Sequence, residues 1–130
     1  MAVRSGIWNA KNHYNFWRPV TAIRATADPA WTPLLPTPAF QEYPSAHSGV
    51  SSAAATVLAS FYGNNTPFTV TSAGLPGVQR DFTTFSAAVL QVEDARIYAG
   101  FHFRFSCTDA ATLGAHVAHY VTSTLMQPLR

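Results

Sequence analysis

The sequence is poor in cysteine and in charged residues. Its single cysteine, Cys107, excludes an intramolecular disulfide and leaves the redox compartment open. Asp, Glu, Lys and Arg make up only 11% of the 130 residues, with a formal net charge of +2. The basic residues are scattered along the chain, which argues against a nucleic-acid-binding surface. No Cys/His spacing typical of a zinc site is present.

Long apolar runs are also missing. The N-terminal residues lack the apolar stretch of a signal peptide. A membrane span needs roughly 20 consecutive apolar residues. The longest candidate, residues 50–62, is interrupted by serine and threonine. We therefore expect a soluble protein without a membrane span.

Apolar and aromatic residues, in contrast, are plentiful. At 48% hydrophobic and 13% aromatic, the composition is that of one folded domain over residues 1–130. Apolar spacing predicts helices over residues 3–27, 45–61, 86–99 and 108–126, and Pro19 is expected to kink or restart the first. A proline-rich stretch, 28–43, is expected to be extended. We predict an all-α bundle of about four helices with long loops, and residues 68–71 and 81–85 can add a short β-hairpin.

Two cations stand in the first predicted helix. Lys11 and Arg18 are seven residues apart, close to two helical turns, so we expect both to project from one face. An ammonium and a guanidinium placed in this way can hold different oxygens of one oxyanion. The alternative is a solvated basic face, which the aromatic neighbours of both residues disfavour.

A second polar group stands where the proline-rich stretch turns into helix. The free N–H groups of a helix start at Ser45 and Ala46, together with the serine hydroxyl, can form an anion-binding cradle. The alternative is that Ser45 is only an N-cap. His47 follows in the first turn, where an imidazole can take or give a proton near neutral pH.

A third group combines Arg96 with His102. Gly100 lies between them and can break the helix, which would let His102 fold back towards Arg96. The alternative, taken from the phenylalanines on both sides of His102, is a buried core histidine.

The order and spacing of the three groups resemble a known signature. Lys-x6-Arg-Pro, Pro-Ser-Ala-His and Arg-x5-His resemble the motifs of the vanadium-dependent haloperoxidases and of the type 2 phosphatidic acid phosphatase superfamily that contains them. The resemblance runs from Trp8 to about Tyr120. It implies a helical-bundle fold of the haloperoxidase and acid phosphatase type. It also implies vanadate or phosphate held by Lys11, Arg18, Ser45, Ala46 and Arg96, with His47 as the acid–base residue and His102 bonded to vanadium or phosphorus.

The resemblance leaves two activities open. In a vanadate-dependent haloperoxidase, hydrogen peroxide and halide are the substrates. In a phosphomonoesterase, a phosphoester is hydrolysed through a phosphohistidine at His102. Trp8 and Phe40 resemble the halide-side aromatics of chloroperoxidase-type members and favour the first activity, although both can equally be core residues. A third possibility is a truncated, non-catalytic module that binds phosphate or vanadate or serves in assembly.

Three substitutions and a missing region depart from the family pattern. Ala46 stands where glycine is usual, Ala95 where serine is frequent, and Ser106 where many members have an aspartate that orients the site. Helices that precede this region in family members are not part of the sequence, so we expect a homo-oligomer, a twofold dimer, that covers the exposed helix face. The compartment is open between bacterial cytoplasm and export without a visible signal.

Overall fold

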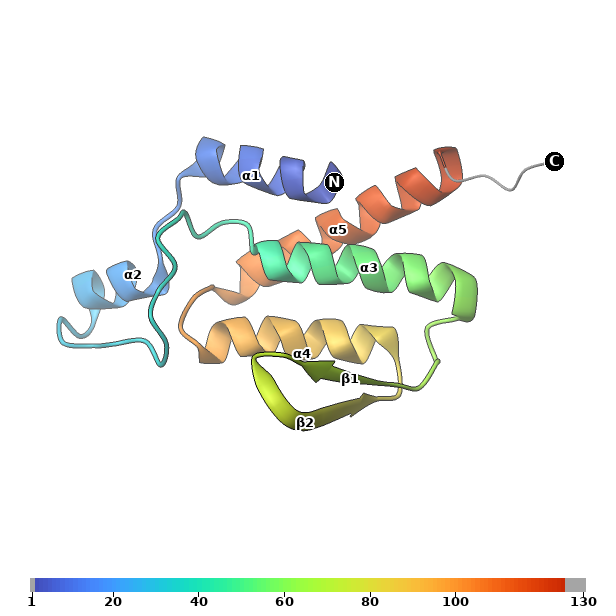
Figure 1. Ribbon diagram of the computed structural model, residues 1–130. Coiled ribbons are helices and arrows are strands. Elements are labelled where there is room, and N and C mark those ends of the chain that lie inside the picture. The colour runs from blue at the N-terminus through green and yellow to red at the C-terminus, as the bar shows by residue number, and fades with distance from the viewer. Residues whose placement is uncertain (1, 126–130) are drawn as a thin grey trace.

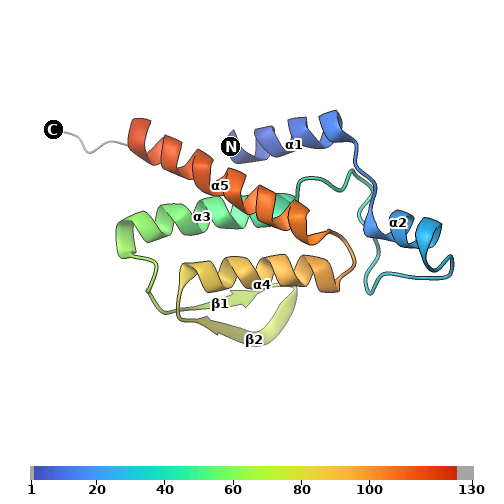
Figure 2. The same cartoon turned by 180° about the vertical axis from the view of Figure 1, so that it is seen from behind.

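The chain folds as a bundle of helices with a two-stranded hairpin along one side (Figure 1). The computed structural model describes residues 2–125. α3 lies between α1 and α4, and α5 crosses it obliquely, as the view from behind shows (Figure 2). The expected helical bundle with a short hairpin is thus confirmed. The elements are α1 (Ala2–Tyr14), α2 (Pro19–Thr26), α3 (Ala46–Tyr62), β1 (Phe68–Ser72), β2 (Leu75–Phe82), α4 (Phe85–Tyr98) and α5 (Arg104–Thr124).

The first helical segment is two helices rather than one. α1 ends where Asn15 adopts a positive φ of 44°, a conformation that asparagine tolerates better than most residues. Arg18 is extended (φ −78°, ψ 155°) because the ring of the following proline disfavours helical geometry. Pro19 then starts α2, where its missing N–H is not needed. The expectation that Lys11 and Arg18 share one helical face is therefore wrong, although both side chains are buried.

Small residues let α3 and α5 approach closely, and this pair makes the most extensive helix–helix contact. A Cβ atom on Gly114 would collide with the carbonyl oxygen of Gly49, and one on Gly49 would lie 2.6 Å from the side chain of Ile7. The hydroxyl of Ser52 donates a hydrogen bond to the carbonyl of Ala111 across the interface (2.7 Å). This packing fixes the start of α3, from which part of the predicted site comes.

The hairpin is longer than the sequence indicated. β1 and β2 are antiparallel, with Phe68 opposite Phe82. Residues 75–80, expected to form the connection, belong to β2 because the turn is confined to residues 73–74. Nearly all of β2 is exposed, so no alternation of apolar and polar residues marked it as a strand. The Phe68 ring stacks on that of Phe85 (5.0 Å between centroids), which attaches the hairpin to α4.

A glycine turn reverses the chain between α4 and α5. Gly100 has a φ of 75°, in the region that favours glycine. The amide of His102 consequently lies 3.4 Å from the carbonyl oxygen of Arg96, so the expected fold-back is confirmed. A Cβ atom on Gly100 would lie 2.8 Å from the side chain of Pro33 and 2.9 Å from that of Trp31. The proline-rich loop therefore packs directly on this turn.

α5 begins at Arg104 rather than at Thr108 as predicted. Asp109 is consequently not in its first turn, and its carboxylate accepts a hydrogen bond from the hydroxyl of Tyr43 (3.0 Å). The residue before the helix is extended and supplies no side-chain cap, so the usual sequence signal of a helix start is missing. The predicted end at residue 126 lies outside the described residues.

Many large apolar side chains are exposed. They include Phe61, Tyr62, Leu90, Tyr98 and Tyr120 on the three longer helices. The twofold dimer, which would cover exposed helix surface, stays a prediction. No helix within residues 2–125 has both the length and the apolar character that crossing a bilayer requires.

Candidate functional site

Lys11 is held by the backbone of residues 41–42, in the loop that leads towards α3. Its side chain is fully buried, and Nζ donates hydrogen bonds to the carbonyls of Gln41 (2.8 Å) and Glu42 (2.9 Å). An ammonium has three N–H donors, so one donor of Lys11 remains for another acceptor. The burial excludes a solvated basic face, and Lys11 is also the only lysine in the sequence.

Arg18 ties the same loop to the segment before α5. Nε and Nη2 donate to the carbonyl of Phe40 (3.0 and 2.8 Å), and Nη2 also reaches that of Gln41 (3.3 Å). Nη1 donates to the carbonyl of Phe101 (2.8 Å). Because Phe101 immediately precedes His102, this hydrogen bond holds the guanidinium beside His102, where the predicted site needs a cation.

Arg96 reaches this region from the last turn of α4. Its guanidinium carbon lies 4.5 Å from the centroid of the Phe101 ring, a cation–π contact. Nε of Arg96 is buried and has no hydrogen-bond partner among residues 2–125. Leaving a buried donor unpaired costs about 1–3 kcal/mol, so such atoms are uncommon without a ligand or a water. Arg96 therefore has donor capacity that the protein itself does not use.

His102 is buried, and its ring contacts a carboxylate that the sequence did not single out. Nδ1 lies 2.9 Å from Oε1 of Glu42. The same oxygen accepts a hydrogen bond from the amide of Phe103 (3.0 Å), and Oε2 accepts one from the hydroxyl of Ser106 (2.6 Å). Glu42 has no exposed surface. Its only sequence signal is that it is one of two glutamates, placed just before the second motif.

Ser106, which stands where many family members have an aspartate, contacts this carboxylate. Glu42 comes from the loop before α3, and its Oε2 accepts a hydrogen bond from the hydroxyl of Ser106. A serine suits this position because its short side chain donates to the carboxylate, whereas an aspartate would repel it.

Glu42 and His102 have complementary protonation states. Burial alone would raise the pKa of Glu42, but hydrogen bonds from His102, Ser106 and the Phe103 amide hold it below its ordinary value. Burial lowers the pKa of His102, against the opposing attraction of Glu42. Near neutral pH the pair is therefore a carboxylate and a neutral imidazole. An ionised carboxylate only accepts hydrogen bonds, so the shared proton sits on Nδ1.

The start of α3 completes the region. The hydroxyl of Ser45 accepts hydrogen bonds from the amide (3.5 Å) and the hydroxyl (3.0 Å) of Ser48, so its expected N-cap role is confirmed. Ala46 is the first residue of α3, and Asn15 is the only non-glycine residue with positive φ within residues 2–125. Alanine is thus unstrained where glycine is usual. The side chain of His47, in the first turn, is exposed.

The pKa values of this region reflect how close the cations are. Burial, and next the charge of Arg18, lowers the pKa of Lys11 from its ordinary 10.5 to about 8. Although His47 is largely exposed, partial desolvation by the neighbouring protein lowers its pKa, and the charges of Arg96 and Lys11 lower it further. His47 is therefore largely neutral at pH 7. Arg96 and Lys11 therefore act on His47, and Arg18 and Lys11 act on His102.

The two predicted halide-side aromatics border the cations. The rings of Trp8 and Phe40 meet edge to face with centroids 5.5 Å apart. Nζ of Lys11 and the guanidinium carbon of Arg18 lie 5.3 and 4.9 Å from the centroid of Phe40. Both aromatics are 37% exposed, so they are not fully buried core residues, and Phe40 is the one that contacts the cations.

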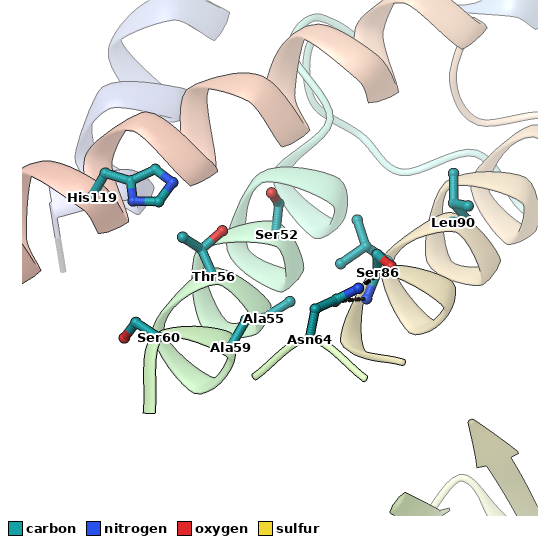
Figure 3. A pocket seen from close by; sticks show the side chains of 10 residues that line it. Ser52, Ala55, Thr56, Ala59, Ser60, Asn64, Ser86, Leu90 and His119 are labelled. Carbon is teal, nitrogen blue, oxygen red and sulfur yellow. Dashed lines mark hydrogen bonds between the residues drawn. The ribbon is translucent and has the colours of Figure 1, made fainter. Parts of the chain in front are cut away.

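A separate cavity of about 570 Å³ lies between α3, α4 and α5 (Figure 3). Its lining includes Ser52, Thr56 and Ala59 on α3, Leu90 on α4 and His119 on α5, and none of the predicted site residues. Within the described part of the chain, no three His, Cys, Asp or Glu side chains converge as a metal site.

Comparison with known families agrees with this geometry. Residues 2–130 match the family model described as VCPO second helical-bundle domain. The chain belongs to this family. The family lies within the vanadium haloperoxidase-like superfamily, as the sequence motifs implied. A comparison with curated proteins gave no significant match.

Solved structures support the same haloperoxidase-like fold. A bacterial vanadium-dependent iodoperoxidase superposes with a TM-score of 0.85 at 34% identity, over 92% of this chain and 29% of its own. Apo- and holo-type bacterial vanadium-dependent chloroperoxidases each superpose with a TM-score of 0.76 at 20% identity, over 90% of this chain and 32% of theirs. The chain therefore spans about a third of the length of these relatives.

The residues of this haloperoxidase-like domain suit an oxyanion such as vanadate. Arg96 has an unpaired buried N–H, and Lys11 keeps one free donor. The amides at the start of α3 have no intrahelical acceptor. His102 has Nδ1 engaged with Glu42, while Nε2 has no partner within residues 2–125. Donors, positive charge and a free imidazole nitrogen are the groups that a tetrahedral oxyanion with an additional ligand needs.

Proposed function

We propose that this domain carries a vanadate-dependent haloperoxidase site, in which halide is oxidised by hydrogen peroxide. Halide, hydrogen peroxide and one proton give hypohalous acid and water, so the halide loses two electrons and the peroxide gains them. The observation that supports this is the convergence of Lys11, Arg18 and Arg96 with His47 and His102, from segments far apart in sequence.

The cations and the start of α3 would hold the oxyanion. Lys11 and Arg96 have unused donors, and Arg18 adds a fixed positive charge beside His102. The amides of Ala46 and its neighbours, with the Ser45 hydroxyl, add donors on another side. Vanadate, when bound, would supply the centre that activates peroxide, and Nε2 of His102 would be the protein atom that holds it. The same contacts would hold phosphate.

His47 would handle the proton. Its imidazole is exposed, so substrates can reach it, and its lowered pKa keeps it neutral near pH 7. A neutral imidazole can accept the proton of hydrogen peroxide and return it to the oxygen that leaves as water. The further proton that the overall reaction consumes would come from solvent, which can reach this exposed imidazole.

The halide would approach along Trp8 and Phe40. These partly exposed rings leave an apolar, poorly hydrated approach to the cations, which suits large, weakly hydrated halides. The relative at 34% identity is an iodoperoxidase, so iodide is the first halide to test and bromide the second.

The direct test is turnover. The protein is supplied with vanadate, hydrogen peroxide and iodide or bromide, and halogenation of a chromogenic acceptor is followed; a chromogenic phosphate ester is tested separately. H102A and R96A are expected to abolish halogenation. The matched controls, H116A and R4A, remove an exposed histidine and an exposed arginine elsewhere and should retain it.

Other outcomes would assign the site differently. Ester hydrolysis that depends on His102 and is blocked by vanadate would replace the proposal with phosphatase activity. Anion binding without either reaction would indicate a non-catalytic binding module. Light scattering would check the predicted twofold dimer, and a monomer at assay concentration would contradict it.

A further inference from the structure

We propose that Glu42 is a positioning residue for His102: its carboxylate holds the imidazole as the Nδ1–H tautomer, so that the lone pair on Nε2 can bond the central atom of the oxyanion. The inference rests on the proposed function and identifies the residue that orients Nε2 of His102 towards the oxyanion. Glu42 is not one of the residues of the three sequence motifs.

The hydrogen bonds of the Glu42 carboxylate determine the tautomer of His102. Two partners of the carboxylate are donors: the Phe103 amide on Oε1 and the Ser106 hydroxyl on Oε2. Both favour the ionised carboxylate, which only accepts hydrogen bonds, so Nδ1 of His102, 2.9 Å from Oε1, must carry the proton. In a neutral imidazole the other nitrogen, Nε2, then has the free lone pair.

The same pattern fixes the direction of the ring. The Phe103 amide is rigid, because Phe103 immediately precedes α5, and it shares Oε1 with Nδ1 of His102. The Ser106 hydroxyl holds the second oxygen, so the carboxylate plane cannot rotate freely. A ring flip of His102 would leave the buried carboxylate with one donor fewer. The geometry thus selects one orientation as well as one tautomer.

Glu42 contributes to the site through two separate groups. Its backbone carbonyl accepts from Lys11, whereas its side chain accepts from His102. Truncating the side chain leaves the Lys11 contact in place, so the positioning of the imidazole can be removed without removing the cation. Truncation also deletes a negative charge beside Lys11 and Arg18. Because the Glu42 charge raises the pKa values of both residues, its loss should lower them.

A purely structural role is the competing explanation. The carboxylate lies at the start of α5, where a negative charge stabilises a helix, and it receives the Phe103 amide there. That role predicts lower stability in variants that remain folded, with no change of the His102 tautomer. The two explanations therefore differ in a spectroscopic observable.

The first experiment records ¹⁵N chemical shifts of the His102 ring in the anion-free protein at about pH 8, where imidazole is neutral. Wild type is expected to show a protonated Nδ1 and an unprotonated Nε2. E42A should shift the ring towards a mixture of tautomers. E42Q should keep the wild-type tautomer, because its amide oxygen can accept from Nδ1. E93Q, at the other buried glutamate, is the matched control and should change nothing.

The second experiment compares two anions in the same variants. Vanadate bonds Nε2, and loss of a ligand's outer partner typically weakens metal binding about 10–100-fold, which is the expected loss in E42A. Phosphate relies on the cations, so its affinity should stay equal or rise once the negative charge is gone. E42Q should retain vanadate binding better than E42A, and H102A should remove the advantage of vanadate over phosphate.

The outcomes separate the two proposals. An E42A ring with the wild-type tautomer, or an equal loss of vanadate and phosphate affinity, overturns the positioning role. Wild-type protein that binds neither anion overturns the proposed function, while the tautomer still decides the role of Glu42. If E42A does not fold, E42D replaces it: the shorter side chain keeps the charge but cannot span His102 and Ser106 together, and the same tautomer shift is expected.

Discussion

Nδ1 of His102 lies 2.9 Å from Oε1 of Glu42, although the two residues are 60 positions apart in the sequence. The contact depends on two backbone features. The turn at Gly100 brings the imidazole back beside α4, and the packing of α3 on α5 sets the loop that carries Glu42 against the start of α5. Changes in either feature should therefore reach the site.

Gly100→Ala should destabilise the fold and weaken anion binding. The positive φ costs a residue with a side chain about 1–2 kcal/mol, and the new methyl would also press on Pro33 and Trp31. Gly77→Ala is the control, since Gly77 has a φ of 78° but open space around it. Urea denaturation should show a clearly larger loss for Gly100→Ala. Equal losses would contradict the close contact between the turn and the proline-rich loop.

Gly114→Ala should lower the free energy of unfolding by about 1–3 kcal/mol, because overpacking forces helices apart. The methyl group would meet the backbone of Gly49, which cannot move aside as a side chain can. Gly6→Ala, on the exposed face of α1 with nothing within 4 Å, should instead stabilise by about 0.5–1 kcal/mol. Thermal and urea unfolding measure both. A Gly114→Ala protein as stable as wild type would be incompatible with the described α3–α5 distance.

Anion affinity should fall as the pH rises through about 8, the pKa of Lys11. An anion binds the protonated ammonium better, so affinity is highest below this pKa. Calorimetry with sulfate between pH 7 and 9.5 would show the fall, and Lys11→Met should remove it. The same pKa shift affects stability with the opposite sign. The unfolded state, with its ordinary pKa of 10.5, binds more protons in this window, so the lysine's contribution to stability is lost as the pH falls from 10.5 to 8.

Arg96→Ala should raise the pKa of His47. After burial, the guanidinium of Arg96 is the largest cause that lowers this pKa, and its removal relieves the repulsion of the imidazolium. NMR titration of the His47 ring protons gives the value directly. Arg4→Ala removes a distant, exposed arginine and should leave it unchanged. A His47 pKa that is the same in both variants would show that Arg96 does not approach this imidazole.

The motif residues could be predicted from the sequence because their chemistry is local. A serine before a helix start and a glycine between Arg96 and His102 each imply a backbone geometry, and the structure has both. Lys11 and Arg18 do meet, but for a different reason than predicted. A break at Asn15 and the restriction imposed by Pro19 position them, rather than one helical face.

Glu42 could not be predicted because its partners are distant in sequence. A glutamate in a loop is normally solvated, and only the folded chain shows that donors from residues 102, 103 and 106 surround it. The long hairpin and the early start of α5 escaped prediction for a related reason. Neither element has a periodic apolar pattern or a capping residue to mark it.

Main-chain carbonyls accept the hydrogen bonds of Lys11 and Arg18, and the Phe40 ring adds a cation–π contact to each. Every residue type presents the same carbonyl, so a change of the side chain at position 40 removes the cation–π contacts and leaves the hydrogen bonds in place. An engineer could therefore exchange Phe40 for smaller or more polar residues to alter which halides approach. The hydrogen bonds of Lys11 and Arg18 to the main chain would be the same in each of these variants.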